Sequence, residues 1–295
     1  AFTYTASAEA VCLLGAQPIF IDVDPISFLL CPKSLKSALT EHSRPGDLVM
    51  PVDLFGYACD YDEILEISDE FGCGVFIDGA QSFGCSYKGK RSIKGVRAFC
   101  TSFFPAKPLG CFGDGGAIFS DDPEFTTKVK SIRNHGMGID KYDIKRIGVN
   151  GRLDTIQAAI LSCKLDILDD ELAKKRVILE RYSKGLNRCV PQTLEYASES
   201  ACAQAVFKLP SGVKNHDLQL ALGDVDIPTM IYYPKTVADQ TAYQQNSRIG
   251  SKIDVSLALT NQTIAFPFHA YLSEMELNEV IEKTNEAIEK LTPSA

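Results

Sequence analysis

An apolar stretch that ends on two prolines around one lysine constrains the fold of this chain most. Residues 96–104 are largely apolar, β-branched or aromatic and predict a buried strand, which Pro105 and Pro108 then break. Lys107 is therefore expected on a rigid corner at a strand end. An amine held there can be desolvated, lose its proton near neutral pH and attack a carbonyl carbon to form a Schiff base. Taken alone, the spacing also fits a lysine in an exposed turn.

Strand-like and helix-like segments alternate through the first half of the chain, which is typical of an α/β fold. Asp78 directly follows the third predicted strand, and in open parallel sheets ligands bind at the carboxyl ends of the strands. We therefore expect Asp78 and Lys107 at one edge of a mostly parallel sheet. The predicted helices cover residues 6–14, 32–39 and 61–71, and the predicted strands cover residues 18–24, 47–52 and 75–77.

The second half of the chain has a different texture. Asp154 predicts the N-cap of a helix, and a further helical pattern continues until Gly185 ends it. After a polar linker at 191–200, the pattern predicts strands at 205–209, 230–233 and 263–266, with helices at 215–222 and 273–291. These features predict a large domain over 1–185 and a smaller C-terminal α/β domain over 186–295.

Charge and cysteine content exclude several classes of protein. The formal charge of −8 disfavours nucleic-acid and anionic-membrane partners, because the overall field repels phosphates. The basic run 85–97 is then expected to be a solvated hairpin or loop. Ten cysteines without a C-x-x-C pair predict reduced thiols of the core and a cytoplasmic protein. There is no apolar run of the roughly 20 residues that cross a bilayer, and no start resembling a signal peptide.

The acid, the lysine and two hydroxyls together suit pyridoxal phosphate. This cofactor needs an amine for its aldehyde, an anion beside its ring nitrogen and hydrogen-bond donors for its phosphate. Lys107, Asp78 and the pair Thr101 and Ser102 are residues of these types.

Six runs carry a more specific resemblance, which extends over essentially the whole chain. They resemble the DegT/DnrJ/EryC1/StrS family of nucleotide-sugar aminotransferases, pyridoxal-phosphate enzymes of fold type I. Within the family they look most like members that aminate the 3-keto group of a UDP-N-acetylglucosaminuronate for O-antigen or lipopolysaccharide synthesis. The runs are FIDGAQSFG (76–84), YKGKR (87–91), TSFFPAKPLG (101–110), GDGGA (113–117), RNHG (133–136) and GVNGRLDTIQAAIL (148–161).

The resemblance implies roles for five residues around the cofactor. Lys107 is expected to be the Schiff-base lysine and the carrier of the proton between amino donor and cofactor. Asp78 would pair with the pyridinium nitrogen, and Gln81 would lie near the ring hydroxyl. Tyr4 would stack on the ring, and Ser102 would bind the phosphate.

The resemblance also implies a homodimer with shared active sites. Asn150 matches a residue that reaches the phosphate of the neighbouring subunit's cofactor. Arg152 is expected to grip the uronate carboxylate or the nucleotide, since a guanidinium binds carboxylates through two parallel hydrogen bonds. Tyr232 and Tyr233 fall on a segment that contacts substrate from the partner subunit. The implied substrates are L-glutamate and a UDP-linked keto-sugar, and no metal ion is expected.

Each of these residues also has a purely structural interpretation. Ser102 can be a strand residue and Gln81 a helix cap, Asn150 can order a turn, and Tyr232 and Tyr233 can pack the small domain.

Alternative functions stay open at this stage. Family members carry a phosphate-binding Gly-Thr/Ser turn before the position of Ala1, so we expect weaker cofactor retention here. The alternative is a truncated, non-catalytic relative that binds a nucleotide-sugar or a partner. The related sugar dehydratases have histidine at the place of Lys107, and a pyridine-nucleotide oxidoreductase would need a G-x-G-x-x-G between strand and helix.

Overall fold

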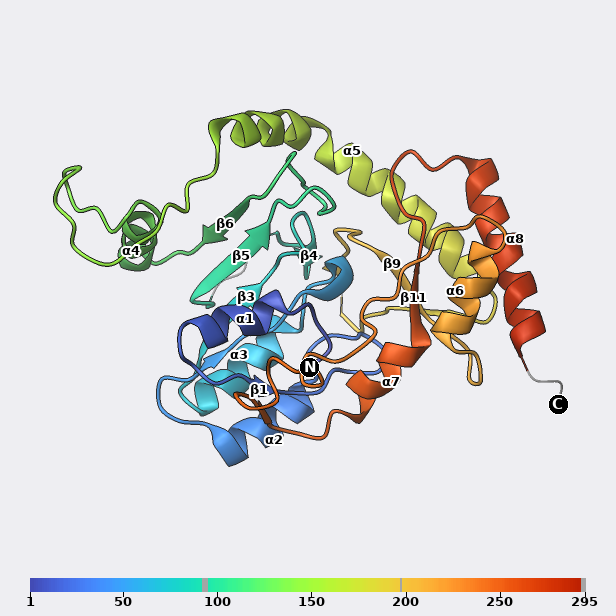
Figure 1. Cartoon of the computed structure of the whole chain (residues 1–295), viewed down its shortest axis with the longest axis horizontal. Coiled ribbons are helices and arrows are strands. Elements are labelled where there is room, and N and C mark those ends of the chain that lie inside the picture. Colours follow the sequence, from blue (N-terminus) through green and yellow to red (C-terminus); the bar gives the residue numbers. More distant parts are fainter. Residues whose placement is uncertain (92–94, 197, 293–295) are drawn as a thin grey trace.

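The computed structural model describes residues 1–91, 95–196 and 198–292, and its first half alternates helices with strands (Figure 1). The helices are α1 (Ala6–Leu13), α2 (Pro32–His42), the 3₁₀ turn η1 (Leu54–Gly56), α3 (Tyr61–Glu70), α4 (Pro123–Arg133), α5 (Thr155–Gly185), α6 (Asn215–Gly223), α7 (Asp254–Gln262) and α8 (Glu274–Leu291). The strands are β1 (Ile19–Phe20), β2 (Leu48–Val49), β3 (Gly74–Asp78), β4 (Ser86–Tyr87), β5 (Ala98–Ser102), β6 (Gly116–Phe119), β7 (Val190–Pro191), β8 (Ser198–Glu199), β9 (Ala205–Lys208), β10 (Arg248–Ile249) and β11 (Thr263–Phe266).

A four-stranded sheet in the order β2-β3-β5-β6 positions the candidate site. Strands β2, β3 and β5 are parallel, and β6 is antiparallel at the edge. Asp78 ends β3 opposite Cys100 of β5, so the carboxyl ends of both strands reach the same edge of the sheet. The α/β class predicted from sequence is confirmed. Strand β5 is shorter than the predicted 96–104 and stops at Ser102, three residues before Pro105.

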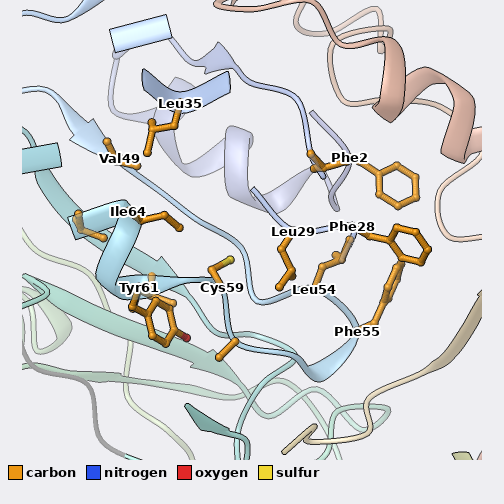
Figure 2. Packing of buried hydrophobic residues seen from close by; sticks show 14 of the residues in the cluster. Phe2, Phe28, Leu29, Leu35, Val49, Leu54, Phe55, Cys59, Tyr61 and Ile64 are labelled. Atoms are coloured by element: carbon orange, nitrogen blue, oxygen red, sulfur yellow. The ribbon is translucent and has the colours of Figure 1, made fainter. Parts of the chain in front are cut away.

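The largest apolar core lies between this sheet and helices α2 and α3, with residues of the turn η1 (Figure 2). Helix α3 begins after Asp60, whose carboxylate accepts a hydrogen bond from the Glu63 amide at 3.4 Å, and it buries Ile64 fully. Phe28 and Phe55 fill the end of the core that faces the chain start. Each such aromatic or aliphatic side chain stabilises the fold by roughly 1.5–3 kcal/mol on burial.

Helix α5 is one continuous helix of 31 residues, although the sequence predicted two successive helical patterns. In Figure 1 it runs from the sheet to the C-terminal helices. Asp154 occupies its N-cap position, but its carboxylate makes no capping hydrogen bond. The predicted side-chain cap is therefore wrong, and only the position is confirmed.

The C-terminal part builds a second core on the far half of α5. Strands β7, β9 and β11 form an antiparallel sheet, and Tyr182 of α5 packs between Phe207 and Phe266 of that sheet. The strand predicted at 230–233 is wrong, because only Met230 bridges to Ala265 there. The chain also returns to the first part, since β10 pairs with β1 and β8 pairs with β4. The division at residue 186 stays a prediction.

The structure agrees only in part with the predictions for the cysteines and for the basic run. All ten cysteines are free thiols, and five of them are buried, whereas Cys163 is exposed on α5. The basic run 85–97 begins with β4 and a bridge between Tyr87 and Lys90, and its residues 92–94 lie outside the described part. Among the described helices, none is long and apolar enough to cross a membrane.

We expect Tyr182→Phe to lower the free energy of unfolding by about 1 kcal/mol. The buried Tyr182 hydroxyl donates to the Pro267 carbonyl at 2.8 Å, and its removal leaves that carbonyl without this partner. Urea denaturation measures the difference. Tyr142→Phe is the matched control, because Tyr142 is 86% exposed. Equal stability of the two variants would contradict this account.

Candidate active site

Lys107 lies in a tight loop directly after strand β5. The Lys107 amide donates to the Phe104 carbonyl at 2.9 Å, and the Cys111 amide donates to the Phe103 carbonyl at 2.8 Å. These two bonds close the loop on itself. The rigid corner predicted from the two prolines is therefore present in the structure.

Gly110 allows the loop to close. A Cβ atom at this position would lie 2.4 Å from the Pro105 carbonyl oxygen, closer than any side chain tolerates. From the outside, the Lys164 ammonium of α5 donates to the Gly110 carbonyl at 2.6 Å. The backbone of the loop that carries Lys107 is therefore held from both sides.

The Lys107 amine is partly desolvated. Burial lowers its pKa below the ordinary lysine value, and the Asp78 carboxylate partly opposes this shift. Hydrogen bonds from other side chains do not contribute to the shift. A lowered pKa increases the fraction of neutral, nucleophilic amine at any given pH. Asp78 at the end of β3 and the loop after β5 that carries Lys107 lie at the same edge of the sheet, as the sequence predicted.

The Asp78 carboxylate is held by donors on both oxygens. The Ala80 amide donates to Oδ1 at 3.1 Å, and the Ser7 hydroxyl of helix α1 donates to Oδ2 at 2.6 Å. Ser7 was missed in the sequence, because nothing in the pattern of α1 links it to a strand end so far along the chain.

A second carboxylate, that of Asp53, lies behind Asp78 and is fully buried. It accepts hydrogen bonds from the Cys59 amide at 3.0 Å, the Tyr61 hydroxyl at 2.5 Å and the Ser82 hydroxyl at 2.7 Å. Burial raises its pKa to about 6, although these hydrogen bonds oppose the shift. The Asp53 amide donates to the Asp78 carbonyl at 3.0 Å, so the two segments are joined through their backbones. Sequence analysis missed Asp53, although it follows Val52 at a strand end as Asp78 follows Ile77.

Gln81 is buried and uses both ends of its amide. Its Oε1 accepts from the Phe55 amide at 2.6 Å, and its Nε2 donates to the Tyr233 hydroxyl at 3.2 Å. Phe55 has a φ of 60°, a conformation that an L-residue adopts only under support from its surroundings. Its ring stacks on Tyr233 with centroids 6.5 Å apart. Burial raises the pKa of the Tyr233 hydroxyl, which keeps the phenol neutral.

Tyr4 and Ser102 are the two remaining residues expected around the cofactor. The Tyr4 ring is 59% exposed, with its centroid 6.3 Å from that of Tyr233, so one face is free to contact a ligand. The Ser102 hydroxyl accepts from the Phe104 amide at 3.2 Å, beside the Lys107 corner. Thr101 donates instead to the Gly79 carbonyl at 3.0 Å and is buried, which is a structural use of its hydroxyl.

Tyr232 lies next to this group and packs its ring 6.5 Å from that of Phe55. Its carbonyl accepts from the Thr263 hydroxyl at 3.2 Å. The next residue, Tyr233, contacts Gln81 of its own chain, as described above. Contact of Tyr232 and Tyr233 with a substrate bound to a partner subunit stays a prediction.

Asn150 and Arg152 are not brought into the cluster. Arg152 donates to the Asn134 side chain at 2.8 Å, and Asn150 accepts from the Arg152 amide at 3.4 Å. None of the hydrogen bonds described for these residues reaches Asp78, Gln81 or Lys107. Both lie at the base of an arm, residues 133–150, that projects from the body between α4 and α5 (Figure 1).

The chemistry of this donor set fits pyridoxal phosphate. The partly desolvated Lys107 amine suits an aldehyde, and the two-donor geometry leaves further lone pairs of the Asp78 carboxylate for a ring N–H. Tyr4 is exposed and Ser102 is half-exposed, so both side chains are accessible to a ligand.

Comparison with known proteins agrees with this geometry. The model of the DegT/DnrJ/EryC1/StrS aminotransferase family matches residues 1–285 of this chain. Among curated proteins, the chain is 40% identical to the UDP-2-acetamido-2-deoxy-3-oxo-D-glucuronate aminotransferase of Pseudomonas aeruginosa, over 92% of this chain and 73% of that protein. It is 30% identical to the dTDP-3-amino-3,4,6-trideoxy-alpha-D-glucose transaminase of Streptomyces venezuelae, over 98% of this chain and 75% of that protein.

Solved structures show the same fold. A DegT DnrJ EryC1 StrS aminotransferase from Brucella abortus superposes with a TM-score of 0.89 at 37% identity, over 97% of this chain and 77% of that one. DesV of S. venezuelae, solved in complex with a ketimine intermediate, also gives a TM-score of 0.89, at 27% identity over 97% of this chain and 76% of that one. The type I fold of pyridoxal-phosphate transferases that the sequence predicted is confirmed.

We expect Asp78→Asn to lower the pKa of the Lys107 amine further. The Asp78 carboxylate is the group that raises this pKa against desolvation, and the neutral amide removes its charge. Trace labelling with acetic anhydride across a pH series, read by mass spectrometry of the Lys107 peptide, measures the midpoint. The exposed Lys130 serves as the internal reference for reagent reactivity. A midpoint that rises in the variant would contradict the assignment.

Proposed function

The chain belongs to the DegT/DnrJ/EryC1/StrS aminotransferase family, and from that premise we propose that it moves an amino group from L-glutamate to the keto group of a nucleotide-linked sugar. The observation that carries this proposal is the desolvated Lys107 amine beside the Asp78 carboxylate at one sheet edge. The acceptor we propose is the 3-keto group of a UDP-N-acetylglucosaminuronate, since the Pseudomonas relative is named for this substrate.

Pyridoxal phosphate, when bound, supplies the aldehyde that carries the amino group and a ring that draws electrons from it. Lys107 would hold that aldehyde through its Nζ and, once released, move the proton between the amino donor and the cofactor. Asp78 would keep a proton on the ring nitrogen. Gln81 and Tyr233 would lie beside the ring, and Ser102 would donate to the phosphate.

The phenol of Tyr233 would contribute a neutral donor beside the ring. Its hydroxyl accepts from Gln81, so its own proton is available for a ligand oxygen. The raised pKa keeps that proton in place at neutral pH.

We further propose that the functional unit is a homodimer. Ile139, Tyr142 and Ile147 of the arm are almost fully exposed, and contiguous exposed apolar side chains mark interaction surfaces. Asn150 and Arg152 lie at the base of the same arm and make no described contact with their own chain's site. Docking of the arm on a second copy would carry these polar groups toward that copy's cofactor and substrate.

We expect Lys107→Ala to prevent covalent attachment of pyridoxal phosphate. The wild-type chain is incubated with the cofactor, reduced with borohydride and mapped by mass spectrometry. The adduct should lie on Lys107, with an absorbance band near the visible edge before reduction.

Lys175→Ala is the matched control for this variant. Lys175 is also half-buried, and desolvation lowers its pKa as well, but Asp78 is not among the groups that shift it. This variant should keep the adduct on Lys107. An adduct on Lys175, or an undiminished band in Lys107→Ala, would sink the assignment. Formation of 2-oxoglutarate from glutamate with the keto-sugar then separates turnover from binding alone.

A mixing experiment tests the shared site. Lys107→Ala and the double variant Asn150→Ala/Arg152→Ala are each expected to be inactive. Random exchange of subunits should restore about a quarter of the wild-type activity, because half of the dimers then carry one intact site.

The control mixture combines Lys107→Ala with Asp78→Ala. These two residues meet within one chain, so no exchange of subunits creates an intact site. Recovery in this control, or none in the first mixture, would contradict a site shared between subunits.

A further inference from the structure

A serine in the first turn of helix α1 reaches the carboxylate at the heart of the site. The Ser7 hydroxyl donates to Asp78 Oδ2 at 2.6 Å, across 71 positions of sequence. A hydroxyl inside a helix usually bonds to a carbonyl of the preceding turn or to water. Here its only proton is used on a carboxylate instead, and hydrogen bonds to an ionised acceptor are about twice as strong as those between neutral groups.

The two donors fix the plane of the Asp78 carboxylate. Ala80 holds Oδ1 through the turn that follows β3, and Ser7 holds Oδ2 from a different element. Without Ser7 the carboxylate would keep one anchor, on Oδ1, and could rotate about the bond to its Cβ atom. Ser7 thus decides which lone pairs of Asp78 point into the site.

The direction of the hydrogen bonds around Ser7 is determined by its single proton. Thr3 lies 3.5 Å from the Ser7 hydroxyl, and Ser7 can only accept in that long contact, since its proton is on Asp78. The hydroxyl of Thr5 turns the other way, to the Tyr243 hydroxyl. Ser7 is therefore the residue of this segment whose side chain acts on Asp78.

We propose that Ser7 is a positioning residue, which orients the Asp78 carboxylate toward the ring nitrogen of bound pyridoxal phosphate and so strengthens the hold on the ring proton. This inference rests on the proposed function. It assigns a role to helix α1 that neither the family match nor the pattern of the helix indicates.

The test compares Ser7→Ala with Ser7→Thr, which keeps a hydroxyl on the same Cβ atom. Alanine has the higher helix propensity, so a loss in Ser7→Ala does not come from a weaker helix. Thr5→Ala is the control, because it removes a hydroxyl from the same segment that does not contact Asp78.

Two measurements report on the cofactor without turnover. Equilibrium dialysis with pyridoxal phosphate should show about tenfold weaker binding for Ser7→Ala, in line with the loss of one hydrogen bond to a charged group. The nitrogen-15 NMR shift of ring-labelled cofactor should move toward that of an unprotonated ring. Ser7→Thr and Thr5→Ala should match the wild type in both measurements.

The nitrogen-15 shift is measured across a pH series, because the charge of Asp78 affects the pKa of several titratable groups. These are Asp53 behind it, Cys100 on β5, Lys107 on the loop after β5, and Tyr233. They are unchanged in all three variants. Only a change specific to Ser7→Ala therefore reports on the hydroxyl.

The outcomes separate this inference from the function on which it rests. If the wild-type chain binds the cofactor, and Ser7→Ala has the same affinity and the same nitrogen-15 shift, the role of Ser7 is overturned. The aminotransferase proposal then still stands. Equal losses in Ser7→Ala, Ser7→Thr and Thr5→Ala also overturn it, because they indicate a general disturbance of α1. A wild-type chain that does not bind the cofactor overturns both.

Discussion

The site depends on the hydrogen bonds that the buried carboxylate of Asp53 accepts. Three donors from the segment 59–61 and from Ser82 converge on it, and its amide binds the carbonyl of Asp78. Burial raises its pKa to about 6. The protonated Asp53 carboxyl therefore favours the folded state most in acid. This contribution is lost as the pH rises through about 6, because the group then ionises and only its hydrogen bonds stabilise the buried charge.

Two neighbouring carboxylates at this edge of the sheet thus have different tasks. Asp53 is enclosed and saturated by protein donors, so it can only organise the backbone around it. Asp78 is half-buried, has one donor on each oxygen and lies beside a lysine whose pKa desolvation lowers. The same residue type at one edge of the sheet becomes structural or reactive according to what surrounds it. Because the protein has a net charge of −8, its overall field repels an anionic cofactor. The binding of such a cofactor therefore has to rely on the local arrangement of donors and charges in the site.

The residues around Lys107 and Gln81 are held by the surrounding protein, whereas the arm at 133–150 is exposed. The site is built from a closed loop, a buried amide and a stacked aromatic pair. The loop packs in a cluster with helix α5, and the aromatic pair packs on the main core. Asn150 and Arg152 lie instead at the base of an arm on which Ile139, Tyr142 and Ile147 are almost fully exposed. The proposed shared site uses this division, since one copy would supply the centre and the other the exposed arm.

The sequence by itself determined the α/β class and the placement of Asp78 and of the Lys107 loop at one edge of the sheet, because parallel strands bring their carboxyl ends to the same edge. It failed on the strand at 230–233 and on the division of α5, where local patterns are ambiguous. Only the tertiary structure decided that Ser7 binds Asp78 and that the Phe55 amide binds Gln81. These contacts join residues far apart in the chain, and they arise from the packing of α1 and η1 against the sheet, which no local periodicity encodes.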